Sequence, residues 1–277
     1  MKIHEKIIEE ISKNRLKPTG KTPFKCEVDS FRSKLTCFLF PVLGGPENSD
    51  CKQQGKELYD ELIRLLNSFD NYCSDTRATV DDFFENLPKL YERLIEDAEA
   101  ICSGDPAAQS VEEVIVSYPG FYAVLIYRIA HALEELNIPV IPRMLTEIAH
   151  SKTGIDIHPK AKIGRSFCID HGTGIVIGES TDIGDYVKLY QNVTLGALSV
   201  KKEEAGQKRH PTLGNRVTVY SGATILGGKT VVGDNSTIGG NVWLTRSVEP
   251  DTIVLNRSAA RFKRDNSKKD LSNYRSE

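Results

Sequence analysis

The chain has 277 residues, of which 39% are hydrophobic and 27% charged, a balance typical of a folded globular protein. Its formal net charge of −2 excludes a strongly basic surface, so we expect no nucleic-acid partner and no attraction to anionic membranes. No apolar run near the N-terminus approaches the roughly 20 residues that span a bilayer, so the sequence predicts neither a membrane anchor nor a signal peptide.

Six cysteines are scattered at positions 26, 37, 51, 73, 102 and 168. None forms a C-x-x-C pair and none has a histidine at zinc-ligand spacing, so the sequence predicts no metal site. Scattered cysteines in a chain of this size favour a reducing compartment, which indicates a cytoplasmic protein. Cys168 is interpreted as a small buried hydrophobe rather than as a nucleophile.

Residues 1–152 are predicted to form a helical domain, because apolar residues recur there at helical spacing. Pro88 predicts a break or a helix start, and Asp105 followed by Pro106 predicts the N-cap of another helix. Segment 17–55 is rich in Lys, Pro, Gly and Cys and is predicted to be irregular. The expected helices lie near the N-terminus and at 57–70, 80–102, 105–117, 119–136 and 139–154.

After Gly154 the apolar period changes to six residues. This self-similarity predicts a parallel β-helix over 153–262, in which each hexad supplies one short strand and one corner. A β-sandwich would instead alternate every two residues, and this segment does not. Residues 263–277 are predicted to be a charged tail. The aliphatic residues at this spacing, with one change of register, one break and one inserted residue in "LGGKT", are Ile157, Ile163, Ile169, Ile175, Ile177, Ile183, Leu189, Leu195, Leu213, Val219, Ile225, Val232, Ile238 and Leu244.

The break in the repeat, "ALSVKKEEAGQKRHPT" at 197–212, is polar and has no aliphatic residue at six-residue spacing. A β-helix accommodates such an insertion as a loop extruded from a corner, often on the binding face. The loop ends in Lys208, Arg209 and His210, which makes its last turn a candidate binding element.

Several motifs together resemble the serine O-acetyltransferases. They are "GDPAAQS", "YPGFYAVLIYRIAH", "GIDIHPKAKIG", "IDHGTGIVIGE", "NVTLG" and the loop closing on "RHP", and the resemblance covers residues 103–262. It implies an α+β chain, with an all-helical N-terminal domain followed by a left-handed parallel β-helix of hexapeptide repeats. It also implies transfer of acetyl from acetyl-CoA to the hydroxyl of L-serine, giving O-acetylserine for cysteine biosynthesis.

Moving an acetyl group from a thioester to an alcohol needs a base, and the imidazole of His171 suits that role because imidazoles titrate near neutral pH. A carboxylate should orient the ring, and both Asp156 and Asp170 are candidates. Neighbours in an extended segment point opposite ways, which disfavours Asp170. The family's coil of three hexads implies that Asp156 lies one rung below His171, roughly 5 Å away. We therefore predict an Asp156–His171 dyad, with Asp170 contacting the substrate's ammonium group.

An amino-acid substrate also carries a carboxylate, which the planar guanidinium of Arg209 suits, with His210 as a second donor. The resemblance implies that Asp105 and Glu179 also reach the serine, Asp105 from across a subunit boundary. As plain structural alternatives, Asp105 is only a helix cap and Glu179 only a solvated corner residue.

The resemblance further implies a homotrimer or a dimer of trimers, with acetyl-CoA bound along a groove between β-helices. The predicted CoA contacts at glycine-rich corners are Gly196, Ala197, Ser221 and Gly240. Basic residues after the last coil, if they do more than form a solvated tail, meet the CoA phosphates: Arg257, Arg261, Lys263 and Arg264. Cysteine is nearly isosteric with serine, and the resemblance implies feedback inhibition at the same contacts.

Two departures from the family pattern concern the C-terminal part of the chain. "VLNRSAARF" stands where many hexapeptide acyltransferases have a Gly-x-Pro-Ala turn, which leaves the CoA contacts near 256–264 undefined. The sequence ends in Glu277, whereas many relatives end in an Ile that docks into cysteine synthase, so we do not expect that complex.

Three other functions remain open from the sequence. One is a hexapeptide acyltransferase with a sugar or homoserine acceptor, or with a different acyl group. Another is a zinc lyase of the carbonic-anhydrase kind, which would need His158, His171 and His210 to converge at a subunit interface. The third is a non-catalytic scaffold for partner enzymes.

Overall fold

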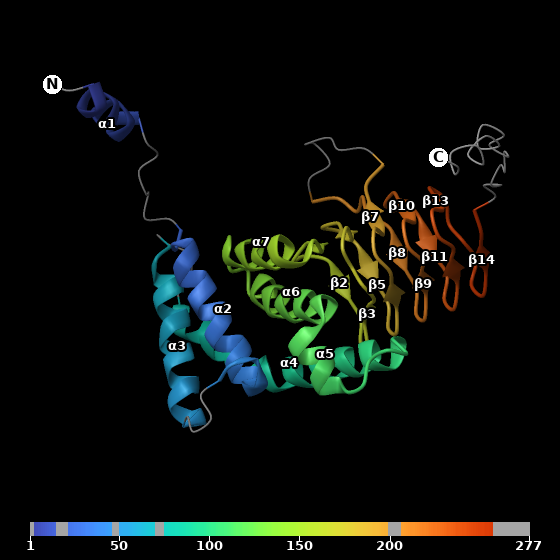
Figure 1. Ribbon diagram of the computed structural model, residues 1–277, viewed down its shortest axis with the longest axis horizontal. Helices are drawn as coiled ribbons and strands as arrows, with labels where there is room; N and C mark the ends of the chain where they lie inside the picture. The colour runs from blue at the N-terminus through green and yellow to red at the C-terminus, as the bar shows by residue number, and fades with distance from the viewer. Residues whose placement is uncertain (1–2, 15–21, 46–49, 70–74, 199–205, 257–277) are drawn as a thin grey trace, which may run out of the picture.

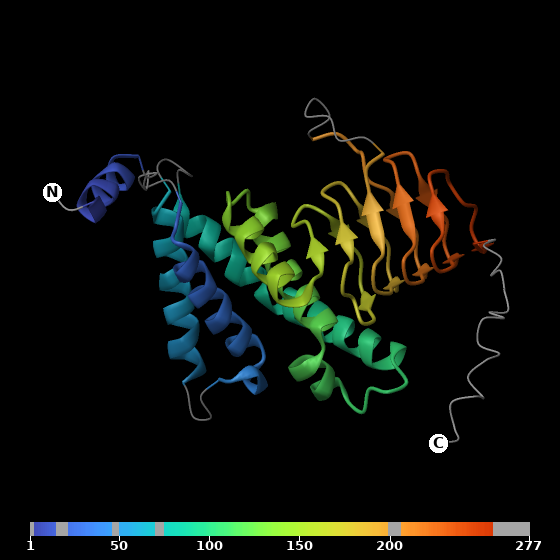
Figure 2. The ribbon, with the colours of Figure 1, turned by 45° about the horizontal axis from the view of Figure 1, so that its top comes forward.

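A computed structural model describes residues 3–14, 22–45, 50–69, 75–198 and 206–256 (Figure 1). Helices form the N-terminal half, and short parallel strands form the C-terminal half, with α4 running beneath α6 and α7 towards the strands (Figure 2). The helices are α1 (Ile3–Asn14), α2 (Lys25–Leu39), α3 (Cys51–Asn67), α4 (Thr76–Gly104), α5 (Val111–Ser117), α6 (Pro119–Glu135) and α7 (Ile141–Thr153), with a 3₁₀ turn at Pro41–Leu43.

The predicted helices at 57–70, 80–102, 119–136 and 139–154 are confirmed, with boundaries that differ by a few residues. They pack around one apolar core, to which α6 contributes fully buried side chains such as Phe121 and Leu125. The N-terminal helix is also present, but α1 buries none of its residues, and its isoleucine stripe is exposed.

The prediction that 17–55 is irregular is wrong, because this segment contains α2 and the start of α3. Val28, Phe31 and Leu35 recur at helical spacing along α2 and are fully buried in the helical core. Composition, namely the Lys, Pro and Gly of the flanking loops, concealed this short apolar stripe.

Two predicted helix boundaries are also wrong. Pro88 lies inside α4, which continues from Thr76 to Gly104, because Pro88 is exposed while Phe83 and Leu94 on the same helix are buried. Asp105 does not cap the following helix. It terminates α4, and its carboxylate accepts a hydrogen bond from the Ala107 amide in a turn, whereas Ser110 is the N-cap of α5.

The predicted left-handed parallel β-helix is confirmed, and its fourteen strands stack in three parallel sheets. The sheet orders are β1-β4-β7-β10-β13, β11-β8-β5-β2 and β14-β12-β9-β6-β3. The strands are β1 (Asp156–Ile157), β2 (Lys162–Ile163), β3 (Cys168–Ile169), β4 (Val176–Ile177), β5 (Asp182–Ile183), β6 (Lys188–Leu189), β7 (Thr194–Gly196), β8 (Thr212–Leu213), β9 (Thr218–Val219), β10 (Thr224–Leu226), β11 (Val231–Val232), β12 (Thr237–Ile238), β13 (Trp243–Leu244) and β14 (Ile253–Val254).

The second residue of almost every strand points inward, so the six-residue aliphatic positions form one buried column. Strand register gives the length of each coil. Val176 and Thr194 are paired neighbours 18 residues apart, whereas Asp156 and Val176 are paired neighbours 20 residues apart. The first coil therefore carries two extra residues, and the inserted residue in "LGGKT" gives the 19-residue step between Thr224 and Trp243.

One buried ion pair joins the helical domain to the β-helix. The Arg128 guanidinium on α6 donates to both carboxylate oxygens of Asp97 on α4, at 2.9 and 3.0 Å. The same guanidinium donates to the carbonyls of Ile163 and Gly164, and Asp97 also accepts from the Phe167 amide at 2.8 Å. Two helices and the first coil are thus fixed relative to one another at a site closed to water.

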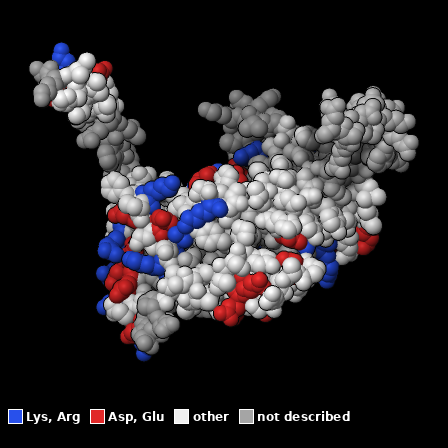
Figure 3. Space-filling model, in the orientation of Figure 1, with Lys and Arg blue, Asp and Glu red and all other residues white. Residues whose placement is uncertain are grey.

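Charged side chains of both signs intersperse over the helical half of the face in view, in keeping with the small net charge (Figure 3). Within the described residues, no single helix has the length and apolarity to cross a membrane, although α5 and α6, taken together as a pair bent by 78°, pass that test.

Candidate active site

The corner that carries His171 is longer than its counterparts. Six residues, 170–175, connect β3 to β4, whereas four residues, 190–193, connect β6 to β7 in the next coil. This difference is the two-residue excess of the first coil. His171 lies in the insertion with a left-handed backbone (φ 59°), and its side chain is 71% exposed. The imidazole therefore projects from the corner instead of joining the buried column.

Five side chains form what we call the His171 group: Asp105, Tyr118, Asp170, His171 and Lys188. The His171 Nε2 lies 3.7 Å from the Asp170 carboxylate, and the Lys188 ammonium pairs with the other Asp170 oxygen at 2.9 Å. Asp105 comes from the end of α4, and its carboxylate accepts a hydrogen bond from the Tyr118 hydroxyl at 2.8 Å.

The charges of the His171 group are set by these contacts. Hydrogen bonds from the Ala107 amide and then from Tyr118 lower the pKa of Asp105, so this carboxylate is ionised at neutral pH. The same bond to Asp105 raises the pKa of Tyr118 to about 12. His171 and Lys188 both act electrostatically on Asp105, which places it beside the 170–175 corner of its own chain. Asp105 thus reaches this corner without crossing a subunit boundary, contrary to the prediction.

The thiol beneath this group is not a nucleophile. Cys168 is buried, and burial raises the pKa of its thiol to about 12. A thiol with that pKa is protonated at neutral pH, and the thiolate is the reactive form. This agrees with its interpretation as a small buried hydrophobe.

A second set of side chains, which we call the Arg209 group, lies at the next corner around the coil: His158, Glu179, Ser180, Arg209 and His210. The Arg209 guanidinium pairs with the Glu179 carboxylate at 2.5 Å. The Ser180 hydroxyl accepts from the amides of Arg209 and His210, at 2.9 and 3.1 Å, which anchors the end of the extruded loop.

The rings of the Arg209 group are held neutral. Burial, reinforced by the Arg209 charge, lowers the pKa of His210 to about 4. The Ser180 amide donates to His210 Nδ1 at 3.1 Å, which leaves the proton on Nε2 as a donor. Gly178 makes room for this ring, since a Cβ there would lie 2.0 Å from His210 Cδ2. Burial, with the Arg143 charge, likewise lowers the pKa of His158 to about 4.

These two neutral histidines predict a pH-dependent stability. Their folded pKa values lie below the ordinary value of 6.5, so the unfolded chain binds more protons between pH 6.5 and 4, and stability falls as the pH drops through that window. We expect the thermal midpoint measured by circular dichroism to fall from pH 7 to pH 4.5. In a His158→Gln/His210→Gln variant the slope over this range should be shallower, and an equal slope would contradict the assignment.

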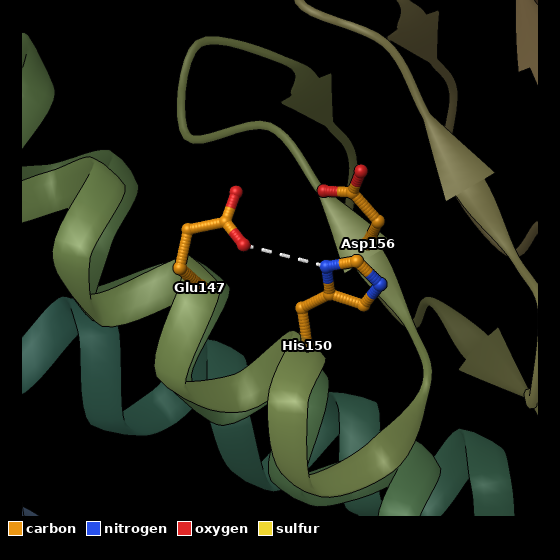
Figure 4. A group of neighbouring side chains, drawn as sticks. All are labelled: Glu147, His150 and Asp156. Carbon is orange, nitrogen blue, oxygen red and sulfur yellow. Dashed lines mark hydrogen bonds and ion pairs between the residues drawn. The ribbon is translucent and has the colours of Figure 1, made fainter.

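Asp156 lies at a third place, on the outer face of β1 beside α7 (Figure 4). Its register partner in the next coil is Val176, five residues beyond His171, so the predicted placement one rung below His171 is wrong. The two-residue insertion at 170–175 causes this shift. The carboxylate of Asp156 lies 3.7 Å from Arg143, and no contact between Asp156 and His171 is found in the described part of the chain. Their pairing as a dyad stays a prediction.

Glu147, His150 and Asp156 are the one group of described residues whose possible metal-ligand atoms all lie within 4.8 Å of one another. His150 Nδ1 is 3.4 Å from the Glu147 carboxylate (Figure 4). The Arg143 guanidinium already contacts both carboxylates, so a bound cation would have to compete with it.

The predicted CoA contacts divide between two corners. Gly196 ends β7 and bonds to Gly227, whereas Ser221 and Gly240 are stacked in successive coils at the corner that follows β9 and β12. Ala197 follows Gly196 and leads to Leu198, which lines a cavity of about 510 Å³. Lys208, Lys229 and Arg246 also line this cavity. The basic residues predicted to meet the CoA phosphates, Arg257, Arg261, Lys263 and Arg264, lie outside the described residues, as do the 263–277 tail and residues 199–205 of the extruded loop.

The site residues thus assemble at two corners of one coil. The His171 group precedes β4, and the Arg209 group follows it. His158 and His210 lie in one group and His171 in the other, so the three histidines that a zinc lyase needs do not converge in one chain. Sequence reasoning missed Tyr118, Ser180, Lys188 and Lys229. Of these, Lys188 had one available signal, since it immediately precedes an inward aliphatic residue in a strand that pairs with β3.

No protein-family model matches the chain. A serine acetyltransferase of Synechococcus elongatus is 50% identical over 189 residues, a match that spans 66% of this chain and 58% of that protein. The serine acetyltransferase of Helicobacter pylori is 53% identical over 125 residues, which span 45% of this chain and 71% of that protein.

Solved structures extend the likeness over most of the chain. Serine acetyltransferase 1 of Entamoeba histolytica, solved in complex with L-cysteine, superposes with a TM-score of 0.74 at 36% identity, over 85% of this chain and 88% of that one. Isoform 3 from the same organism, in complex with cysteine, gives a TM-score of 0.74 at 30% identity, over 95% and 94% of the two chains.

Proposed function

Because the chain belongs to the serine acetyltransferase family, we propose that it transfers an acetyl group from acetyl-CoA to the hydroxyl of L-serine. The product would be O-acetylserine, a precursor of cysteine. The sequence prediction of this family is confirmed, and family membership ranks this activity above a sugar or homoserine acyltransferase, a zinc lyase and a non-catalytic scaffold.

The observation that carries the choice of acceptor is an unused donor. Arg209 Nη1 is buried and has no hydrogen-bond partner in the described structure, although Nη2 of the same guanidinium pairs with Glu179. A buried unpaired donor is costly, so a site of this kind gains from a bound acceptor. The carboxylate of an amino acid supplies one, and the donor Nε2–H of His210 belongs to the same group.

The His171 group suits the other end of the substrate. Asp105 and Asp170 place two carboxylates near the exposed imidazole, where an ammonium group would bind. His171 takes the proton of the serine hydroxyl as the oxygen attacks the thioester carbonyl. The tetrahedral intermediate then collapses, the carbon–sulfur bond breaks, and the imidazolium returns its proton to the CoA thiolate. No acyl-enzyme is needed, since the Cys168 thiol is protonated and buried.

Two carboxylates remain candidates for orienting His171. Asp156 is the one that the resemblance implies, and Asp170 is the one within 3.7 Å of the ring in this structure. If Asp156 orients the ring, Asp156→Asn lowers kcat, whereas Asp170→Asn mainly raises KM for serine because it removes an ammonium contact.

A second chain would complete the site. The 71% exposure of His171 leaves the base in water, and the Arg209 group lies at a different corner of the same coil. A trimer around the β-helices, or a dimer of trimers, would bring the His171 group of one subunit to the Arg209 group of another and would cover both. The groove between the subunits would then hold acetyl-CoA.

Gly196 and Ala197 lead into the cavity of about 510 Å³, whose cationic residues suit the phosphates of CoA. Lys229 and Arg246 thus join Gly196, Ala197, Ser221 and Gly240 as proposed CoA contacts. Inhibition by cysteine follows from its likeness to serine and is supported by relatives solved with cysteine bound. The five described cysteines are free thiols, in keeping with a cytoplasmic protein.

Release of CoA thiol tests the proposed activity. Purified protein with acetyl-CoA should release thiol faster with L-serine than with buffer, L-homoserine or a sugar acceptor, and mass spectrometry should find O-acetylserine. If serine gives no more thiol than buffer while another acceptor does, the proposal fails.

A further inference from the structure

Lys188 occupies a position between the two acidic residues of the His171 group. Its ammonium pairs with Asp170 at 2.9 Å and donates a hydrogen bond to the carbonyl of Gly104 at 2.7 Å. Gly104 is the last residue of α4 and directly precedes Asp105. One ammonium therefore joins the side chain of one carboxylate residue to the backbone next to the other.

The surroundings of Lys188 hold its ammonium in place. The side chain is 18% exposed, and the ammonium lies 4.5 Å from the centre of the Tyr190 ring, at cation–π distance. Burial alone would lower the pKa of Lys188, but its interactions with Tyr190 and Asp170 outweigh burial and raise it. The amine is thus always charged at neutral pH, and the Asp170 side chain, 12% exposed, has a fixed partner.

We propose that Lys188 is a positioning residue of the amino-group subsite, which holds Asp170 of the β-helix and the Asp105 segment of the helical domain at a fixed separation. The inference rests on the proposed function, because it assumes that these two carboxylates bind the ammonium group of serine. Lys188 itself touches neither substrate nor His171.

The proposal has a consequence for the charge of the subsite. Asp105 and Asp170 carry two negative charges, and Lys188 neutralises one of them. A substrate with one ammonium group then balances the other, whereas without Lys188 two carboxylates would face one cation and Asp170 would lose the contact that orients it.

Steady-state kinetics of Lys188→Met test this role. We expect KM for L-serine to rise roughly tenfold or more, as the loss of a charge-assisted hydrogen bond predicts, while kcat changes much less. Lys188→Arg should retain part of the affinity because it keeps the charge. Lys162→Met is the matched control, since Lys162 begins a β-helix strand in the same way as Lys188 but is exposed, and its kinetics should equal the wild type.

A double variant shows whether Lys188 acts through Asp170. In an Asp170→Asn background, Lys188→Met should raise KM little further, because the partner is already gone. Independent multiplication of the two effects would overturn the proposal, as would an unchanged KM in Lys188→Met or a fall in kcat alone. Thermal unfolding of each variant identifies any loss of fold, and Lys188→Arg and Asp170→Asn still decide the question if Lys188→Met does not fold.

Amine labelling gives a readout that does not depend on acetyl transfer. With acetic anhydride as the probe, wild-type Lys188 should react much more slowly than Lys162, and Asp170→Asn should speed its labelling. Equal labelling of the two lysines would overturn the anchoring itself. If wild-type protein is inactive with serine yet Lys188 is protected, the proposed function fails while the anchor stands.

Discussion

Replacing His171 with alanine is expected to lower kcat for serine acetylation about 10²- to 10⁴-fold, the usual contribution of a general base. The loss should fall on the chemical step, because His171 is 71% exposed and buries little surface that a substitution could disturb. The thermal midpoint should therefore match that of the wild type. Thiol release at saturating acetyl-CoA and serine measures the effect, and a variant with nearly full kcat would remove His171 from the mechanism.

A mixing experiment extends this result to the shared site. His171→Ala and Arg209→Ala each damage a different corner of the β-helix, and each should be nearly inactive alone. If the corners of two subunits form one site, unfolding and refolding the two variants together should restore activity, because some interfaces receive both intact groups. No recovery from mixed assemblies would argue for a site made by one chain.

Replacing Arg128 with methionine is expected to lower the free energy of unfolding by about 3–5 kcal/mol, the usual cost of removing one partner from a buried ion pair. Asp97 would remain at 0% exposure with only the Phe167 amide, and the carbonyls of Ile163 and Gly164 would lose their donor. Urea denaturation followed by circular dichroism measures the change.

An exposed pair provides the matched control for Arg128. Lys13→Met breaks the Lys13–Glu9 pair on α1, whose side chains are 70% and 50% exposed, and it should change stability by less than about 1 kcal/mol. An Asp97→Leu/Arg128→Met variant should recover part of the loss, because it removes the uncompensated carboxylate. Equal destabilisation by Arg128→Met and Lys13→Met would show that the buried pair does not hold the domains together.

The β-helix was predictable because its cause is local and repetitive. Each hexad places one aliphatic residue inward, so Ile157, Ile163 and Ile169 reveal the coil without any knowledge of long-range contacts. The helix α2 was missed for the opposite reason, since Val28, Phe31 and Leu35 form a short stripe that composition alone hides.

The candidate site was only partly predictable. Asp170, His171, Arg209 and His210 stand out as polar residues within or beside the repeat, and the structure places them at corners. Lys188 was invisible because its partners, Asp170 and Gly104, come from another coil and another domain. The position of Asp156 relative to His171 depends on coil length, which the two extra residues at 170–175 change.

The unequal coil lengths give this scaffold an unusual tolerance. Asp156 pairs with Val176 across 20 residues and Val176 with Thr194 across 18, and Thr194 pairs with Thr224 across 30, yet every rung meets its neighbour in register. In an ordinary alternating strand, a shift of one residue would turn every side chain to the opposite face. Here the chain can lengthen at a corner without moving one aliphatic residue of the core. His171, Arg209 and His210 all lie in such insertions, so a new acceptor pocket can evolve by changes in corner length while the folded core stays the same.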